Sequence, residues 1–181
     1  MNLILAPLLL GPLLASAQTL SIPLTTTSSG LHSIVSFTLA DLTFKVVLDT
    51  GSGNLILPST SCPLCVHKTL YPLPLQLTQP NTKQHLVIFA SGSVLGAYVE
   101  EDEMCAPGSS VFGPAYTTYE WCTFDINFLA ATQMTVESIL SNTEFDGIAG
   151  LGLPGMSIGE GYSLLNRWKE EGFKGFRFDM I

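Results

Sequence analysis

Residues 45–58 read Lys45-Val46-Val47-Leu48-Asp49-Thr50-Gly51-Ser52-Gly53-Asn54-Leu55-Ile56-Leu57-Pro58. Two apolar runs of the kind that form buried strands flank a short polar loop that begins with a carboxylate. Burying Asp49 at the end of a strand costs free energy unless donors satisfy it, and Thr50, Ser52 and the amides beside Gly51 and Gly53 can supply them. We interpret Asp49 as a candidate acid/base group. The alternative is an Asp-Thr-Gly turn between two strands that carries no chemistry.

The residues around this loop resemble a known family. The pepsin-like aspartic proteases have a first active-site loop that is similar to Asp49-Thr50-Gly51-Ser52 with the flanks Val46-Val47-Leu48 and Asn54-Leu55. The strand that runs behind that loop in the same family resembles Phe145-Asp146-Gly147-Ile148-Ala149-Gly150-Leu151-Gly152. Two motifs in the right order are more specific than either alone. The resemblance implies a mostly β fold, a pepsin-like acid protease lobe of antiparallel, partly barrel-like sheets.

The last part of the chain predicts one short helix. Leu164, Leu165 and Trp168 fall at helical spacing, and Gly172 can end the helix. Residues 176–181 predict the opening of another strand, where the sequence stops. Before these elements, a solvated turn is predicted for the acidic run Glu100-Glu101-Asp102-Glu103.

The resemblance implies an aspartic endopeptidase, in which two aspartates share one proton and activate a water molecule. In that family each carboxylate comes from one Asp-Thr-Gly or Asp-Ser-Gly loop. Of the six Asp residues in the sequence, only Asp49 sits in such a loop. Residues 18–181 are therefore predicted to form the amino-terminal lobe of a two-lobed enzyme, with Asp49 as the catalytic residue. Thr50, Gly51 and Ser52 form its supporting loop.

The second carboxylate has two possible sources. A carboxyl-terminal lobe can supply it, in which case this chain is a fragment, as the stop inside the predicted last strand favours. A second copy of the chain can also supply it, as in the homodimeric retroviral proteases. On either view the chain alone is a poor protease of peptide or protein substrates. The non-enzyme alternative is an inactive pepsin-like protein that binds peptides or inhibits.

A hairpin over residues 86–99 resembles the family's flap, which closes over bound peptide. The family tip usually reads Tyr-Gly-Thr-Gly-Ser, and these positions here hold Phe89, Ala90, Ser91, Gly92 and Ser93. In the family, the Tyr hydroxyl bonds a Trp whose position is Ile56 in this chain. Because both ends of that hydrogen bond are replaced together, neither leaves a buried polar group unpaired. An apolar contact is expected instead.

Residues 1–17 predict a cleaved secretion signal. This segment is apolar and ends in the small residues Ala15-Ser16-Ala17, which suit a signal peptidase. It is too short for a comfortable membrane span, although the lack of Lys or Arg near Met1 keeps an uncleaved anchor as the alternative. No stable membrane span is expected after signal removal, and the chain is predicted to be secreted or to lie in an endomembrane, lysosome-like or vacuole-like compartment.

The cysteines fit that compartment. Cys62, Cys65, Cys105 and Cys122 are disulfide candidates, and three pairings are open from the sequence. If Cys105 pairs with Cys122, the other two close a very small loop where the family often carries one. A zinc site is the alternative, since Cys-x-x-Cys is half of a common ligand set, but the second half is missing. We expect no metal and no cofactor.

Composition excludes other classes of function. With 46% hydrophobic and 12% charged residues the chain can form a core, and its net charge of -8 with seven Lys and Arg argues against nucleic acid. A serine nucleophile would need a Gly-x-Ser-x-Gly elbow and a partner histidine. His32, His67 and His85 lack any partner pattern, and no phosphate-binding glycine loop opens the predicted helix.

Overall fold

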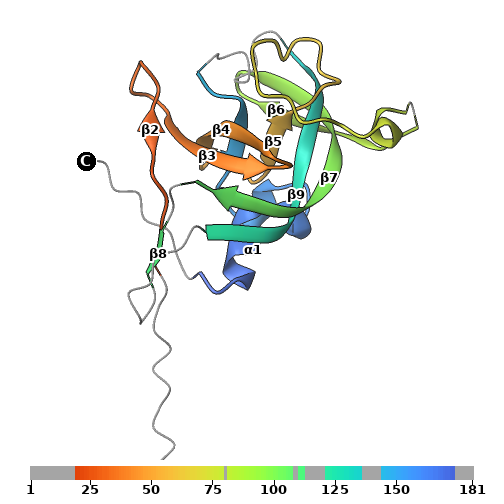
Figure 1. Ribbon diagram of the computed structural model, residues 1–181. Helices are drawn as coiled ribbons and strands as arrows, with labels where there is room; N and C mark the ends of the chain where they lie inside the picture. Colours follow the sequence, from red (N-terminus) through yellow and green to blue (C-terminus); the bar gives the residue numbers. More distant parts are fainter. Residues whose placement is uncertain (1–18, 80, 108–109, 113–120, 136–143, 174–181) are drawn as a thin grey trace, which may run out of the picture.

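The computed structural model describes residues 19–79, 81–107, 110–112, 121–135 and 144–173. The predicted secretion signal and the predicted strand over residues 176–181 lie outside these ranges. The elements, shown in Figure 1, are β1 (Thr19–Ser21), β2 (Thr25–Thr26), β3 (Ser33–Leu39), β4 (Leu42–Asp49), β5 (Leu55–Pro58), η1 (Leu75–Thr78), β6 (Gln84–Phe89), β7 (Gly92–Ala106), β8 (Ser110–Phe112), β9 (Trp121–Met134), β10 (Gly147–Gly150), η3 (Pro154–Met156), η4 (Glu160–Tyr162) and α1 (Leu164–Glu170).

One large sheet curls back on itself. Its strand order is β2-β3-β4-β10-β5-β9-β7-β6, and β3 pairs again with β7 through Thr38 and Leu39. This second pairing closes β3, β4, β10, β5, β9 and β7 into a partly closed barrel, visible in Figure 1. The described strands are mostly antiparallel, as predicted. Two pairs are parallel, β10 with β4 and β5 with β9.

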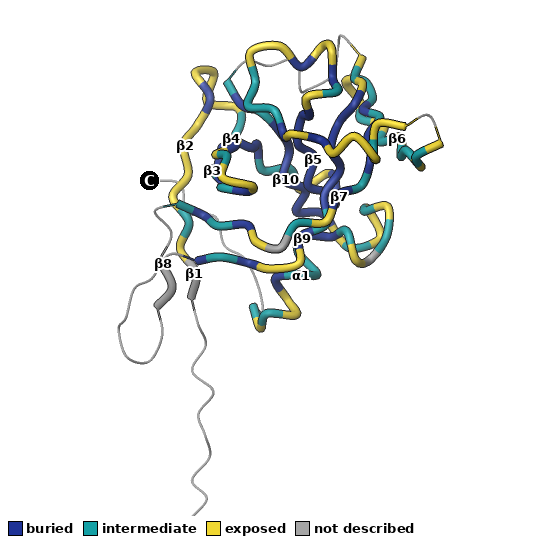
Figure 2. The backbone as a smooth tube through the Cα atoms, turned by 45° about the vertical axis from the view of Figure 1, so that its right-hand side comes forward, coloured by how far each residue is buried: buried dark blue, intermediate teal, exposed yellow. Residues whose placement is uncertain are grey.

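The core follows from alternation along the strands. In β3 the side chains of Val35, Phe37 and Leu39 are buried, while the residues between them are only partly covered. Successive side chains of a strand point to opposite faces, so this period of two places one apolar face inside the barrel. Figure 2 shows the buried backbone gathered where β5, β7, β9 and β10 meet. Each large apolar side chain buried there contributes about 1.5–3 kcal/mol.

The predicted helix is present as α1. Leu164 and Trp168 are buried on its inner face, and the side chain of Ser163 caps its first turn. Gly172 adopts a left-handed backbone with φ of 98° and donates its N–H to the carbonyl of Lys169 at 2.9 Å. A residue without a Cβ takes that conformation at little cost, and therefore the helix ends there.

The prediction of a solvated turn over residues 100–103 is wrong. These residues lie inside β7 and pair with β9, with Glu101 opposite Ile126 and Glu103 opposite Phe124. The carboxylate of Glu101 accepts a hydrogen bond from the hydroxyl of the buried Tyr71. The backbone groups of residues 100–103 form their hydrogen bonds with β9. A run of acidic residues does not indicate a pairing with a strand so far away in the sequence.

Two disulfides are present among the described residues, Cys62–Cys65 and Cys105–Cys122. The second joins residues that lie directly opposite each other in the pairing of β7 with β9. Of the three ways to pair the four cysteines, the structure therefore has Cys62 with Cys65 and Cys105 with Cys122. The first bridge closes a loop just after β5.

We expect secreted material to contain no free thiol and no bound zinc. Replacing both Cys105 and Cys122 by Ser should cost about 3 kcal/mol, because their bridge restrains a longer segment of the unfolded chain. The Cys62→Ser, Cys65→Ser pair should cost less, since it opens a loop of sequence separation 3 rather than 17. Thiol titration in denaturant and denaturant unfolding test this. Four reactive thiols, or zinc bound in equal amount to protein, would contradict it.

Candidate active site

Asp49 is the last residue of β4, at the point where the barrel opens into a loop. Strand β4 lies between β3 and β10, and in the parallel pairing with β10 Asp49 is opposite Gly150. The preceding Val46 and Val47 are buried, while Asp49 itself is partly exposed. The apolar strand is thus anchored in the core and presents a carboxylate at its end.

Both carboxylate oxygens of Asp49 are held by its own loop. The N–H of Gly51 donates to Oδ1 at 2.9 Å, and the hydroxyl of Ser52 donates to Oδ2 at 2.6 Å. Ser52 is buried, so its hydroxyl is fixed in this direction. Hydrogen bonds to an ionised acceptor are stronger than neutral ones, and two of them set the orientation of the carboxylate. Thr50 is exposed, and among the described contacts its hydroxyl is not a donor to Asp49.

The loop after Asp49 lies directly on β10 and the residues that follow it. The N–H of Gly150 donates to the carbonyl of Asn54 at 2.9 Å, and the N–H of Gly152 donates to the carbonyl of Ser52 at 2.7 Å. A Cβ at Gly150 would approach the backbone nitrogen of Asn54 to 2.4 Å. The motif of residues 145–152 therefore packs against the Asp49 loop through contacts so close that only glycine fits.

Strands β6 and β7 form the hairpin that the sequence predicts, and Ala90 and Ser91 form its two-residue tip. Phe89 and Gly92 are the last pair of the ladder. The side chain of Phe89 packs against an apolar cluster that contains Ile56. In the family these two positions hold the hydrogen-bonded Tyr and Trp, and in this chain both side chains belong to one apolar environment. The hairpin's role as a flap stays a prediction.

Comparison with known proteins agrees with this geometry. Residues 35–173 match the family model described as eukaryotic aspartyl protease. The chain belongs to this family. Sheep renin (Ovis aries) is 30% identical over 122 residues, which cover 65% of this chain and 27% of renin. Cathepsin E of Rattus norvegicus is 28% identical over 119 residues, covering 64% of this chain and 26% of that relative.

A plant relative shows the same extent of similarity. Aspartic proteinase oryzasin-1 of Oryza sativa subsp. japonica is 28% identical over 133 residues, covering 71% of this chain and 23% of its own length. The aspartyl protease chain thus spans about a quarter of the length of the curated relatives it matches. The family is established by the match, while the activity of those longer proteins is carried over only as a proposal.

Asp146, in the second motif of this aspartyl protease lobe, holds neighbouring backbone segments together. Its carboxylate accepts the N–H of Lys45 at 2.8 Å and the N–H of Thr69 at 2.9 Å. Its own N–H donates to the carbonyl of Lys45. These bonds connect the residue before β10 and the loop between β5 and η1 to the middle of β4. Asp146 therefore helps to place Asp49 and is not a second copy of it.

Sequence reasoning missed the position of Asn54 in the site of this protease lobe. Its side chain is buried, accepts the N–H of Ile158 at Oδ1 over 3.3 Å and donates from Nδ2 to the hydroxyl of Tyr98 over 3.2 Å. Asn54 stands inside the family motif, which is a usable signal. Nothing in the sequence indicates its partners, since both are far away along the chain.

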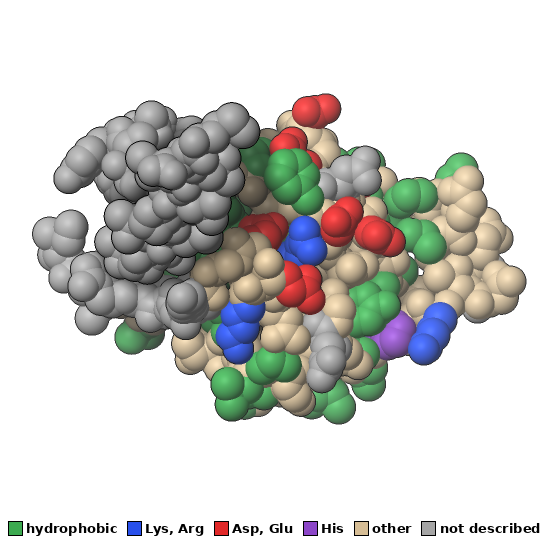
Figure 3. Space-filling view, turned by 90° about the horizontal axis from the view of Figure 1, so that it is seen from below, with side chains coloured by type: hydrophobic (Ala, Val, Ile, Leu, Met, Phe, Trp, Pro, Cys, Tyr) green, Lys and Arg blue, Asp and Glu red, His purple; other side chains and the backbone are tan. Residues whose placement is uncertain are grey.

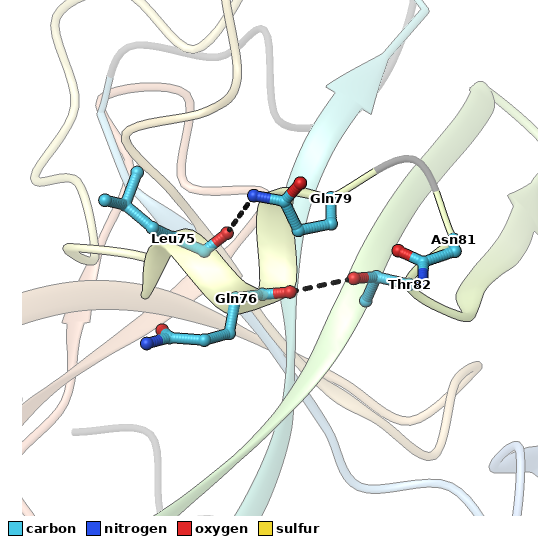
Figure 4. A pocket seen from close by; sticks show the side chains of 5 residues that line it. All are labelled: Leu75, Gln76, Gln79, Asn81 and Thr82. Carbon is cyan, nitrogen blue, oxygen red and sulfur yellow. Dashed lines mark hydrogen bonds between the residues drawn. The ribbon is translucent and has the colours of Figure 1, made fainter.

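A hollow elsewhere on the protease lobe offers little for chemistry. It has a volume of about 470 Å³ and lies in the segment before β6, as Figure 4 shows. The amide of Gln79 donates to the carbonyl of Leu75 at 3.3 Å, and the Thr82 hydroxyl donates to the carbonyl of Gln76 at 3.0 Å. These polar groups thus bond within the segment, and none of the lining residues belongs to the Asp49 loop or the hairpin tip. The lining residues are Leu75, Gln76, Gln79, Asn81 and Thr82.

One group of side chains in the described part of the protease lobe has a metal-like arrangement. It consists of Glu103, Cys105 and Cys122, whose carboxylate oxygen and sulfur atoms lie within 4.8 Å of one another. The two sulfur atoms are bonded to each other, so neither is available as a thiolate ligand. The group therefore gives no argument for a metal centre.

Proposed function

We propose that this chain supplies one carboxylate, Asp49, to an aspartic endopeptidase centre that contains two. The observation that carries the proposal is the pair of hydrogen bonds from Gly51 and Ser52, which hold both oxygens of Asp49 at the end of β4. The family match supports the same reaction class. The second carboxylate comes from a further lobe or from a second copy of the chain.

The reaction follows from putting two carboxyl groups together. Two carboxyl groups about 3 Å apart cannot both ionise, because their negative charges would repel each other, so the pair retains one proton. The ionised carboxylate removes a proton from a water molecule, whose oxygen forms a bond to the scissile carbonyl carbon. The other carboxyl donates its proton to the carbonyl oxygen. The tetrahedral product then breaks its C–N bond as the amine is protonated, which gives an acid and an amine.

The chain's own residues have defined parts in this scheme. Gly51 and Ser52 orient Asp49 and stabilise its charge without further reorganisation. The hairpin tip, from Phe89 to Ser93, covers the peptide and keeps bulk water from the reacting bond. Because Phe89 and its surroundings are apolar, the preferred substrates are peptides or proteins cut between apolar residues. Acidic pH supplies the shared proton.

The setting of this chemistry is an oxidising compartment, either the extracellular space or a lysosome-like or vacuole-like organelle. The two disulfides and the predicted secretion signal over residues 1–17 support it. Within the described ranges, no helix has the length and apolar character needed to cross a bilayer. On the face in Figure 3, Asp and Glu side chains lie among the Lys and Arg side chains, so that face offers nucleic acid no continuous basic surface.

A protease assay with class-specific inhibitors tests the proposal. Material that contains both carboxylates should cleave peptides with adjacent apolar residues at acidic pH. Pepstatin should stop this cleavage, whereas reagents for serine and cysteine nucleophiles and metal chelators should leave it unchanged. Cleavage that resists pepstatin, or peptide binding without any cleavage, would favour another function.

A further inference from the structure

Tyr98 joins three segments of the lobe at one aromatic ring. It lies in β7, half-buried, and its ring stacks on that of Tyr162 with centroids 3.9 Å apart and an angle of 25° between the planes. The ring of His85, from β6, meets it edge-on at a centroid distance of 4.5 Å. The base of the hairpin and the η4 segment before α1 therefore meet at this side chain.

The hydroxyl of Tyr98 reaches a fourth segment, the end of the Asp49 loop. It accepts a hydrogen bond from the amide of Asn54 at 3.2 Å. Asn54 is 2% exposed and lies against Gly150, the residue opposite Asp49 in the sheet. Burial raises the pKa of the Tyr98 hydroxyl, so the group stays protonated across the acid and neutral range. Removing it would leave a buried amide group of Asn54 unpaired, which costs more than the bond itself contributes.

We propose that Tyr98 is a positioning residue that couples the base of the β6–β7 hairpin to the Asp49 loop through Asn54. The inference rests on the proposed function, in which that hairpin covers substrate and that loop holds the reacting carboxylate. A displacement of β7 moves the Tyr98 hydroxyl, and Asn54 transmits the change to the backbone that carries Gly51 and Ser52. The position of the hairpin over a peptide and the orientation of Asp49 are thereby linked.

Tyr71, in the loop between β5 and η1, provides a matched comparison within the same lobe. It is also a tyrosine with a bonded hydroxyl, which donates to Glu101, and its ring packs edge-on against Phe128 at 4.9 Å. None of its described bonds leads to the Asp49 loop. Replacing Tyr71 by Phe therefore makes the same chemical change as Tyr98→Phe at a place without that link.

Hydrogen exchange of the Gly51 amide tests the coupling without any need for enzyme activity. This N–H is bonded to Oδ1 of Asp49, so its exchange rate reports how firmly the carboxylate is held. In the full chain, Tyr98→Phe should speed exchange at Gly51 roughly fivefold, as expected for one lost hydrogen bond. Tyr71→Phe should leave the rate within twofold of wild type.

A double-mutant cycle separates positioning from general loosening. If Tyr98 acts through Asn54, Tyr98→Phe should add little to the exchange at Gly51 once Asn54→Ala is present. An unchanged rate in Tyr98→Phe, equal acceleration by Tyr71→Phe, or additive effects of the two site variants would each overturn the inference. These results are independent of the proposed function, whose failure would be seen as absent cleavage with the exchange pattern intact.

Discussion

Replacing Asp49 by Asn is expected to lower pepstatin-sensitive cleavage by roughly 10²–10⁴-fold, the range typical for loss of a general acid or base. The amide has nearly the shape of the carboxylate, and the Ser52 hydroxyl can turn to remain hydrogen bonded, so the fold should survive. What is lost is the group that exchanges a proton with the attacking water. The measurement is kcat/KM on an apolar peptide at acidic pH, in material that contains both carboxylates.

Asp41→Asn is the matched control for this variant. Asp41 lies in the turn between β3 and β4 with φ of 60°, a conformation that Asn adopts readily. The same change of charge at that turn should leave cleavage unaltered. Equal activity of the Asp49→Asn and wild-type proteins would show that Asp49 is not the catalytic residue.

Replacing Gly150 by Ala should lower the free energy of unfolding of the lobe by about 3 kcal/mol or more, because the added methyl group can be accommodated only if the neighbouring backbone shifts. The new methyl group would lie 2.4 Å from the nitrogen and 2.7 Å from the oxygen of Asn54. Both atoms belong to the backbone beside the Asp49 loop and cannot rotate away. Denaturant unfolding followed by tryptophan fluorescence measures the change in free energy.

Gly155→Ala provides the comparison for that loss. No atom lies within 4 Å of where its Cβ would be, so this variant should unfold within about 0.5 kcal/mol of wild type. If Gly150→Ala were as stable as Gly155→Ala, the close contact between β10 and the Asp49 loop would not be present in solution.

The parts of the fold that could be predicted have local causes. Apolar residues at helical spacing and a terminal glycine specify α1, and a polar loop between two apolar runs places Asp49 at a strand end. The hairpin of β6 and β7 follows from two apolar arms around a tip of small residues, Ala90 and Ser91. In each case neighbours in the sequence determine the backbone, so the pattern is sufficient.

The parts that could not be predicted depend on distant partners. Glu101 and Glu103 look like surface turn residues until β9 is placed beside them. The disulfide pairing requires the register of β7 with β9, and the bond from Asn54 to Tyr98 requires the barrel to close. The family resemblance placed residues 145–152 behind the Asp49 loop, but the parallel pairing of β10 with β4 was not predicted. Physical reading of short segments carries no information about such long-range contacts.

The proposed function depends most on Asp49 being the one aspartate in an Asp-Thr-Gly or Asp-Ser-Gly loop within residues 18–181. The direct measurement is the specific activity of residues 18–181 at acidic pH over a range of protein concentrations, with sedimentation to give the oligomeric state. We predict no pepstatin-sensitive cleavage while the protein is monomeric, and cleavage only when a second copy or a further lobe joins it. Two results together would contradict the assignment of Asp49. The monomer would cleave with a specific activity that does not change with protein concentration, and the Asp49→Asn variant would cleave equally well.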